Sequence, residues 1–546
     1  MKRRIFLSIT MLCLTLLVTM VMPINGIAFA DEINLKSISN NKIISNLDLS
    51  SPELNIKYEQ KNDDILGPES FCFKNKGGYY LLDTSDNKIV SINSDNKLEK
   101  KIKLGNIYGT KICSDQNDNV YVLDVAKGII AKNHNEILTE FSIDASIVDA
   151  VIDFGVNSQD NVFVTYADEK GGKTKYYKLS DGKATLTREK EGRIASDGVN
   201  YKTILVKDPG FDVGHACTIF LMDENGNITK ELPIKSNHWL EGAIYLGQKD
   251  GDYIIKTHEM ETDINNNVLF EDIVKIVNKD GNTKLQNILP KEIKYSQNST
   301  IAKDGKVYHF NKQEKNVKIE ELGFTKNIDS SLDNIKTKYQ SDKSNSNSNL
   351  LKTQSLRTLA MVNRSLIQQT VYSYYSCYWY CTYNNYENWG GNTRPRYITS
   401  YNRYYTGIPY NWGGWDTWLG FMNKMNNGTT AGNINTSIVL SNLGGVDCSG
   451  YAQRCWGIND YKRSTTGLDA SNISFSISVA NLKYGDAWNR SDHIMMYHQR
   501  DGYGNYILYE ATKLNSYDRV AHTTRTASYV QGSYHSIRRL NINEDV

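Results

Sequence analysis

Cysteine is scarce in this chain, which has eight in 546 residues, one of them at position 13. Such a low content excludes a small scaffold held together by disulfides. Charge of one sign is also lacking, because 63 basic residues face 61 acidic ones and leave a net charge of +2. Nucleic-acid-binding proteins usually carry a strong basic excess, so no nucleic-acid partner is expected. After Asp31 no apolar run is long enough to span a bilayer.

The first thirty residues have the order of a secretory signal peptide. Lys2-Arg3-Arg4 precede an apolar run over residues 5–22, and Ala28-Phe29-Ala30 supplies a small-x-small cleavage site. A membrane anchor is the less favoured alternative, because Pro23 ends the apolar run before this site. We therefore expect a secreted, extracellular or cell-wall-associated protein with no membrane partner once residues 1–30 are removed. Seven cysteines remain, so at least one thiol stays unpaired in a monomer.

The composition, 40% hydrophobic and 23% charged, is that of a globular protein, and the length is too great for one core. Short apolar strands recur before residue 325, with a period of about 41 residues over the first four, which is typical of propeller blades. These strands begin at Tyr79, Val120, Val162, Thr203, Tyr253 and Val307. The repeat predicts an all-β, six-bladed propeller-like domain over residues 49–324, with insertions such as that around residues 265–267. A pair of irregular antiparallel sandwiches remains an alternative.

Residues 325–355 are polar, centre on SDKSNSNSN and lack apolar periodicity, which predicts a linker before a second domain over residues 356–546. The aromatic residues that crowd positions 372–389 favour core packing over sugar stacking. Cys377 and Cys381 stand four apart, a spacing that suits one helix face, and a local disulfide or two buried thiols is favoured over zinc ligands. The scattered histidines of the first domain have no metal-ligand spacing, so no metal is predicted.

A candidate nucleophile follows the glycine turn Gly444-Gly445. Cys448 would lie in the first turn of a helix, where unpaired backbone N–H groups and the helix dipole favour a thiolate and lower the pKa from its free value of about 8.5. A thiolate attacks acyl carbon atoms, and the neighbouring N–H groups can receive the oxyanion that forms. Cys455, two turns later, is expected to be a buried structural cysteine.

A nucleophilic cysteine needs a base, and four histidines follow the linker: His493, His498, His522 and His535. His493 opens a strand-like run, and His498, five residues on, would point to the opposite face of the same strand. His493 is therefore the predicted base.

The residue that orients this base can be predicted from hairpin pairing. Asp501-Gly502 is a favoured two-residue turn, and pairing across it sets residue 493 opposite Glu510. This carboxylate would hold the imidazole in one tautomer. A turn centred on Tyr503-Gly504 would shift the register, which leaves Asn505 or another polar group as the alternative.

Three motifs in this order resemble those of the NlpC-type, papain-like peptidases that cut peptidoglycan stem peptides. They are Pro409-Tyr410-Asn411-Trp412-Gly413-Gly414, which resembles the PYxWGG element; Asp447-Cys448-Ser449-Gly450, which resembles the DCSG nucleophile turn; and the LKxGD…H segment from Leu482. The resemblance covers residues 356–546 and implies an α+β domain with a cysteine helix on a small antiparallel sheet.

The resemblance also implies a site and a substrate. Tyr410, Trp412, Asp447 and Ser449 would line the pocket for a stem peptide, with Asp447 near its free amine, and the bond cut would join D-glutamate to a diamino acid. The sequence departs from the usual pattern in having Glu510 where the family usually has histidine. It also carries an insertion over residues 415–443, which leaves the shape of the cleft open.

The sequence therefore predicts a secreted cysteine hydrolase of peptidoglycan stem peptides that needs no metal or organic cofactor, since thiolate, imidazole and backbone donors suffice for acyl transfer. One alternative keeps the fold but makes the enzyme an amidase or acyltransferase. Another is a non-catalytic protein whose propeller binds a wall polymer or a protein ligand.

Overall fold

The computed structural model describes residues 41–544 except 57–58, 62–63, 135–136, 144–150, 158–160, 168–171, 210, 212, 263–267, 291–298, 304, 314, 329, 334–358, 388–393 and 441. The predicted signal peptide, the proposed insertion at residues 265–267 and most of the predicted linker lie outside this part. Within it, no helix is long and apolar enough to cross a membrane.

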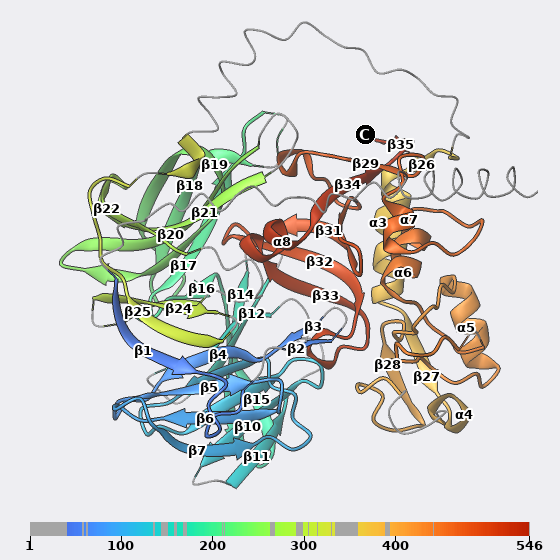
Figure 1. Ribbon diagram of the computed structural model, residues 1–546, viewed down its shortest axis with the longest axis horizontal. Coiled ribbons are helices and arrows are strands. Elements are labelled where there is room, and N and C mark those ends of the chain that lie inside the picture. Colours follow the sequence, from blue (N-terminus) through green and yellow to red (C-terminus); the bar gives the residue numbers. More distant parts are fainter. Residues whose placement is uncertain are drawn as a thin grey trace, which may run out of the picture. The chain divides into compact units, whose positions relative to one another are not determined.

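The N-terminal part of the chain forms sheets of four, eight, seven and four strands (Figure 1). We divide them into six antiparallel, four-stranded units, which we call blades. A short hairpin of β2 (Glu59–Lys61) and β3 (Asp64–Leu66) precedes them. Blade 1 contains β4 (Pro68–Phe73), β5 (Tyr79–Asp83), β6 (Lys88–Ile92) and β7 (Leu98–Lys103); blade 2 contains β8 (Lys111–Ser114), β9 (Val120–Asp124), β10 (Ile129–His134) and β11 (Ile137–Ser142); blade 3 contains β12 (Val151–Val156), β13 (Val162–Tyr166), β14 (Lys173–Ser180) and β15 (Lys183–Glu191).

Blades 4 and 5 share one long strand, and blade 6 takes its outer strand from the start of the described chain. Blade 4 contains β16 (Arg193–Ile194), β17 (Asn200–Val206), β18 (Gly214–Met222) and the first half of β19 (Ile228–Lys249). Blade 5 contains the second half of β19 with β20 (Asp252–Thr262), β21 (Val268–Val277) and β22 (Thr283–Ile288). Blade 6 contains β23 (Ser299–Lys303), β24 (Lys306–Lys312), β25 (Asn316–Glu321) and, as its outer strand, β1 (Lys42–Asp48).

The predicted repeat is confirmed, because each of the six predicted strands is the second strand of one blade. The blades pack face to face, and all five residues of β5 and of β9 are buried. Between blades 1 and 6, the rings of Phe71 and Phe310 stack with centroids 4.6 Å apart, which closes a propeller-like ring. The predicted start at residue 49 misses β1, whose partner strand lies at the other end of the domain.

Loops between these strands are held by a recurring side-chain contact. Asp115 accepts hydrogen bonds from the backbone N–H groups of Asn117 and Asn119, each at 2.9 Å. Asp223 accepts from the N–H groups two and four residues further on in the same way. An aspartate or asparagine at the start of the loop thus replaces the backbone partners that the turn removes.

After residue 358 the chain forms a second region built of helices and a six-stranded antiparallel sheet with the strand order β29-β34-β30-β31-β32-β33. Its helices are α3 (Arg364–Tyr375), α4 (Tyr383–Tyr386), α5 (Trp418–Asn426), α6 (Cys448–Cys455), α7 (Thr465–Leu468), η2 (Val479–Asn481), η3 (Leu514–Ser516) and α8 (Ala527–Ser533); its strands are β26 (Val362–Asn363), β27 (Tyr378–Cys381), β28 (Arg403–Thr406), β29 (Ser474–Ser476), β30 (Ala487–Asn489), β31 (Ile494–Arg500), β32 (Asn505–Thr512), β33 (Arg519–Thr526), β34 (His535–Arg539) and β35 (Ile542–Asn543).

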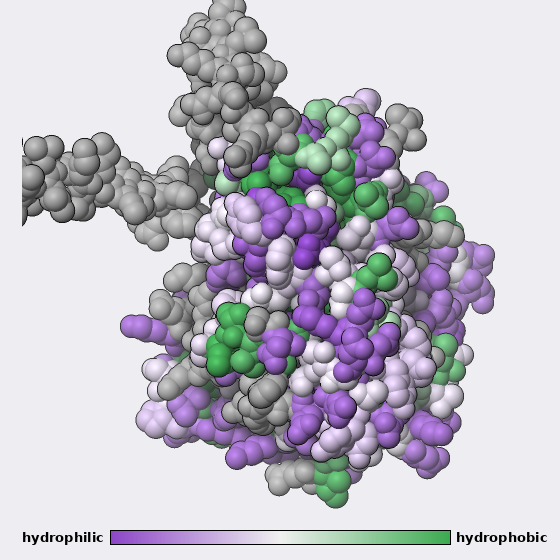
Figure 2. Space-filling model, turned by 90° about the vertical axis from the view of Figure 1, so that its right-hand side faces the viewer, coloured by the Kyte–Doolittle hydropathy of each residue, from purple (hydrophilic) through white to green (hydrophobic). Residues whose placement is uncertain are grey.

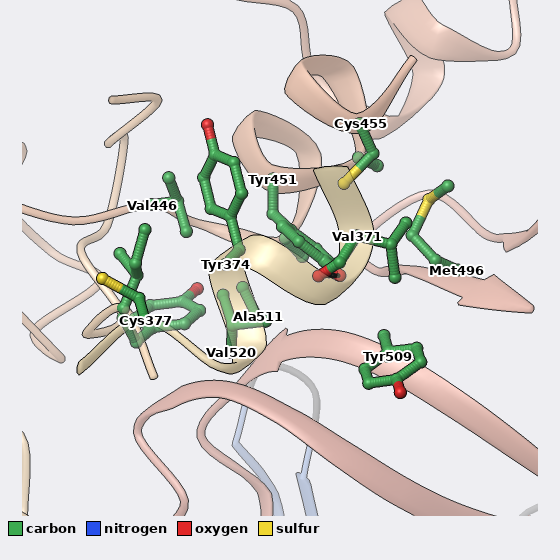
Figure 3. Close-up of a cluster of buried hydrophobic side chains, with 14 of the residues drawn as sticks. Val371, Tyr374, Cys377, Val446, Tyr451, Cys455, Met496, Tyr509, Ala511 and Val520 are labelled. Atoms are coloured by element: carbon green, nitrogen blue, oxygen red, sulfur yellow. Dashed lines mark hydrogen bonds between the residues drawn. The ribbon is translucent and has the colours of Figure 1, made fainter. Parts of the chain in front are cut away.

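The core of this region lies between α3, α6 and one face of the sheet, as Figure 3 shows. Val371 and Tyr374 from α3 meet Tyr451 from α6 and Met496 from β31, and all four are at most 2% exposed. Burying side chains of this size stabilises the fold by about 1.5–3 kcal/mol each. This packing fixes the start of α6 against the start of β31.

The dense aromatic segment divides between core and surface. Trp379 is buried, whereas Tyr378 and Tyr404 stack on each other at 4.6 Å and remain exposed. Cys377 and Cys381 are two buried free thiols, which was one of the predicted alternatives. The prediction that they share one helix face is wrong, because Cys381 is the last residue of strand β27. The face in Figure 2 is largely hydrophilic, with a few separate hydrophobic patches.

The tip of the β31–β32 hairpin contacts the blades. Tyr503 forms an antiparallel bridge to Gly242 of β19, and the Ala243 N–H donates to the Gly502 carbonyl at 3.0 Å. A Cβ atom on Gly242 would lie 1.9 Å from the Gly504 nitrogen, so only glycine permits this approach.

A buried charge network adjoins this contact. Arg500 of β31 donates to Glu241 at 3.0 Å, and His258 lies 3.3 Å from the same carboxylate and 2.7 Å from Asp272. Burial alone would lower the pKa of His258, but Asp272 and Glu241 raise it to about 10. Burial alone would raise the pKa of Glu241, but Arg500 and His258 lower it to about 2.

Candidate active site

Cys448 is the first residue of α6 and is 4% exposed. Asp447 caps the helix by accepting a hydrogen bond from the Gly450 N–H at 2.7 Å. Gly450 has to be glycine, because a Cβ atom there would lie 2.2 Å from the Gly414 carbonyl oxygen. The two glycine-containing motifs of the sequence are therefore in contact, and together they set the position of the cysteine.

The sulfur of Cys448 lies 4.0 Å from the carbonyl oxygen of Asp492, the residue before His493. His493 is fully buried at the start of β31, and its Nε2 lies 2.6 Å from Oε2 of Glu510 on β32. The predicted contact between this carboxylate and this imidazole is thus present, while the catalytic role of the three residues remains a prediction.

The predicted register of the hairpin is wrong. Asp501 and Gly502 do not form a two-residue turn; the Asp501 side chain accepts from the N–H groups of Tyr503 and Asn505, and the strands resume pairing at Arg500 and Tyr506. This is the same aspartate-closed loop that joins strands in the blades.

A bulge at residue 498 reduces the shift from three residues to two. Beyond the bulge Met496 pairs with Tyr509, so the register sets Glu510 opposite Met495 and two positions from His493. A shift of two residues leaves side chains on the same face of a strand, and diagonal neighbours remain within reach. The imidazole and the carboxylate meet for that reason.

Glu510 sits in a buried polar cluster. Besides His493, the carboxylate accepts hydrogen bonds from the Thr523 hydroxyl at 2.5 Å and from Arg525 at 3.0 and 2.8 Å. Burial alone would raise the pKa of Glu510, but the charge of Arg525 and the hydrogen bond from His493 hold it well below its ordinary value. Glu510 is therefore ionised at neutral pH. Sequence reasoning missed both Thr523 and Arg525.

The other histidines of the region lie elsewhere. His498 and His522 contact each other at 3.1 Å, and burial lowers the pKa of His498 to about 4 and that of His522 to about 3. His535 lies on the exterior, 2.8 Å from Asp469. Cys455 is buried, and burial raises the pKa of its thiol well above the ordinary value, which suits a structural role.

The predicted pocket residues surround the start of α6. Tyr410 is fully buried and forms a parallel bridge to Val446, and the Gly413 N–H donates to Asp447 at 3.1 Å. Trp412 is half-buried against the core.

A lysine that the sequence did not point to sits at Asp447 and Ser449. Lys462 Nζ lies 2.9 Å from the Asp447 carboxylate and 2.6 Å from the Ser449 hydroxyl. The charge of Asp447, expected to receive a substrate amine, is therefore already compensated by an ammonium group of the chain. The sequence offered only one hint of this contact, namely that Lys462 follows the nucleophile helix closely along the chain.

Nothing in the described part of the chain resembles a metal centre: no three histidine, cysteine, aspartate or glutamate side chains are grouped as ligands there. The donors at the site are a thiol, an imidazole, carboxylates and backbone N–H groups.

Comparison with known proteins gives no family assignment. No family model matches the chain, and no curated protein matches it. Among solved structures, virginiamycin B lyase from Staphylococcus aureus is 12% identical with a TM-score of 0.31, covering 52% of this chain and 99% of its own. The gluconolactonase XC5397 from Xanthomonas campestris is 9% identical with a TM-score of 0.30, covering 52% and 100%. The Dos1 propeller is 10% identical with a TM-score of 0.30, covering 49% and 81%.

TM-scores near 0.3 carry no argument about this chain.

Proposed function

We propose that residues 356–546 form a papain-like cysteine hydrolase domain of a secreted protein, and that it cuts an amide bond in peptidoglycan stem peptides. Cys448 is the nucleophile, His493 the base and Glu510 the residue that orients the base. The observation that carries the proposal is the buried contact of His493 with an ionised Glu510, at the strand end that Cys448 approaches.

The reaction follows from the roles of these groups. Because Nε2 of His493 faces Glu510, Nδ1 is the nitrogen that takes the proton of the Cys448 thiol. The thiolate attacks the carbonyl carbon of the amide, and backbone N–H groups at the start of α6 receive the negative oxygen. His493 then gives its proton to the leaving amine, and water hydrolyses the thioester and restores the thiol.

Glu510 supplies the electrostatic part of this mechanism. An ionised carboxylate on Nε2 holds one tautomer of the imidazole and stabilises the imidazolium that forms. Arg525 and Thr523 keep the carboxylate ionised and fixed, so the orienting group does not itself take the proton.

The contact of Lys462 with Asp447 bears on the substrate. A peptide with a free N-terminal amine would have to displace an ammonium group already held at 2.9 Å. We therefore favour stem peptides whose N-terminal end is blocked, as it is when the peptide is still attached to the sugar. Cleavage between D-glutamate and the diamino acid is the proposed bond.

Isolated peptidoglycan treated with wild type and with Cys448→Ala tests the proposal, with products identified by mass. Stem-peptide cleavage by the wild type should disappear in Cys448→Ala. Cys455→Ala, which shortens a cysteine of the same helix, is the matched control and should retain cleavage at a temperature where it is folded. Equal products from wild type and Cys448→Ala would refute the nucleophile.

Two rival functions give different results in the same experiment. An amidase would free the lactyl carboxyl group of the sugar and leave the stem peptide intact. A non-catalytic binding protein would release nothing, and a thiol-reactive probe at mildly acidic pH would label its Cys448 no faster than a free thiol.

A further inference from the structure

A cavity of about 420 Å³ lies at the centre of the propeller-like ring. The inner strands β4, β8, β12, β16 and β19 contribute to its wall, and so do residues 503–505, 514–515, 517 and 523–526 of the C-terminal region. Its volume is within the range of small-molecule pockets, which is about 300–1,000 Å³. The proposed hydrolase chemistry does not use this cavity.

Arg193 from β16 lines the cavity and is 7% exposed. Within the described part of the chain, its Nε and Nη1 atoms have no hydrogen-bond partner. The nearest carboxylate is that of Asp153, which lies 3.9 Å from Nη2 and is too distant for a hydrogen bond. Cζ of Arg193 lies 4.7 Å from the ring centre of Tyr503. A buried guanidinium with donors left over is costly unless an acceptor reaches them.

Lys111 from β8 lines the same cavity, and the charges of Asp153 and Arg193 act on its ammonium group. Burial lowers the pKa of its ammonium group, Asp153 opposes this effect, and the positive charge of Arg193 adds to it. Two cations, from blades 2 and 4, thus line one interior space. Lys256, 3.7 Å from Asp272, adds a third cation to the wall.

We propose that this central cavity is a binding site for a small molecule that presents an oxyanion, a carboxylate or a phosphate, to Arg193 and Lys111. An oxyanion supplies the acceptors that the Arg193 donors lack and compensates the charge of both side chains. A cationic ligand would add to their repulsion, and a ligand without an acceptor would leave the Nε and Nη1 donors of Arg193 unpaired. Glu69 and Asp153 also line the cavity, and they orient the ligand by excluding its anionic end from their side.

The site is connected to the C-terminal region through Tyr503. Its ring packs against Arg193 on one side and lies edge to face with Tyr201 at 5.7 Å, and its hydroxyl accepts from the Thr203 N–H at 3.4 Å. A bound oxyanion that fixes Arg193 would therefore also stabilise the contact of the β31–β32 hairpin tip with the blades. The other end of this hairpin carries His493.

The test is calorimetric titration of the full mature chain carrying Cys448→Ala with inorganic phosphate and, separately, with acetate, at ionic strength held constant with chloride. The Cys448→Ala background makes the result independent of catalysis. We expect saturable binding of at least one probe, weakened about tenfold or more by Arg193→Gln and by Lys111→Met, since a charged hydrogen bond is lost in each. The probe that binds more tightly identifies the class of oxyanion.

Arg188→Gln is the matched control, because Arg188 is exposed on the outer strand β15 and lies over Tyr176. It should bind the probe as the parent does. Thermal unfolding without ligand should show Arg193→Gln folded, since the change removes a buried charge. The absence of saturable binding, or equal binding by the parent and both cavity variants, would overturn the proposal.

Discussion

Replacing Glu510 by glutamine tests the proposed site most directly. The change removes the charge from a carboxylate that contacts His493 at 2.6 Å and Arg525 at 2.8 Å. Breaking a buried ion pair by neutralising one partner costs about 3–5 kcal/mol. Loss of the orienting carboxylate of a catalytic triad lowers kcat by a factor on the order of 10⁴.

A single variant cannot separate these effects, because 3–5 kcal/mol is a large part of the roughly 5–15 kcal/mol that holds a domain folded. The double variant Glu510→Gln/Arg525→Met removes both charges. Replacing a whole buried pair is often neutral for stability, so we expect a midpoint of thermal unfolding near that of wild type.

The assay compares release of stem-peptide fragments from isolated peptidoglycan by wild type, Arg525→Met and the double variant. Arg525→Met alone keeps the Glu510 carboxylate on His493 but leaves that carboxylate without its cation. We expect this variant to have a lower midpoint of thermal unfolding than wild type. The double variant should be folded and almost inactive. A folded double variant that cleaves as fast as wild type would refute the orienting role of Glu510.

Three further predictions concern other parts of the chain. Lys462→Met should raise kcat/KM for stem peptides with a free amine relative to N-acetylated ones, and an unchanged ratio would argue against the competition proposed above. Gly242→Ala should lower the thermal midpoint by several degrees, because its Cβ would lie 1.9 Å from the Gly504 nitrogen. The raised pKa of His258, about 10, contributes stability that is complete below about pH 6.5 and is lost as pH rises toward 10. The lowered pKa of Glu241, about 2, contributes stability that is complete above about pH 4.3 and is lost as pH falls toward 2. The midpoint of thermal unfolding should therefore be highest between about pH 4.3 and pH 6.5. A pH profile of this midpoint that is unchanged by His258→Gln would contradict the prediction.

The blades could be predicted from the sequence because the second strand of each contains a short run of apolar residues. The strands that begin at Tyr79 and Val120, for example, therefore stand out in the sequence at a regular spacing. The division of β19 between two blades and the pairing of β1 with β25 could not be predicted, since both depend on contacts between distant segments.

The contact between His493 and Glu510 was predicted from a hairpin register that is itself wrong. The loop at Asp501 and the bulge at residue 498 each change the pairing, yet their sum preserves the face on which Glu510 lies. Turn type depends on a side-chain hydrogen bond, which hairpin arithmetic does not include. Arg525 was missed, although a carboxylate expected between two strands requires a compensating cation and the next strand offers one.

The pairing of β1 with β25 has a consequence for how the protein is made. Lys42 pairs with Glu321, so the ring cannot close until almost three hundred further residues have been synthesised. Contacts of such long sequence separation slow folding, because the loop must be ordered before the contact forms. Until then blade 6 has an open strand edge, which is a template for aggregation. A chain that ends before β25 would keep that edge, and we expect such truncations to be insoluble.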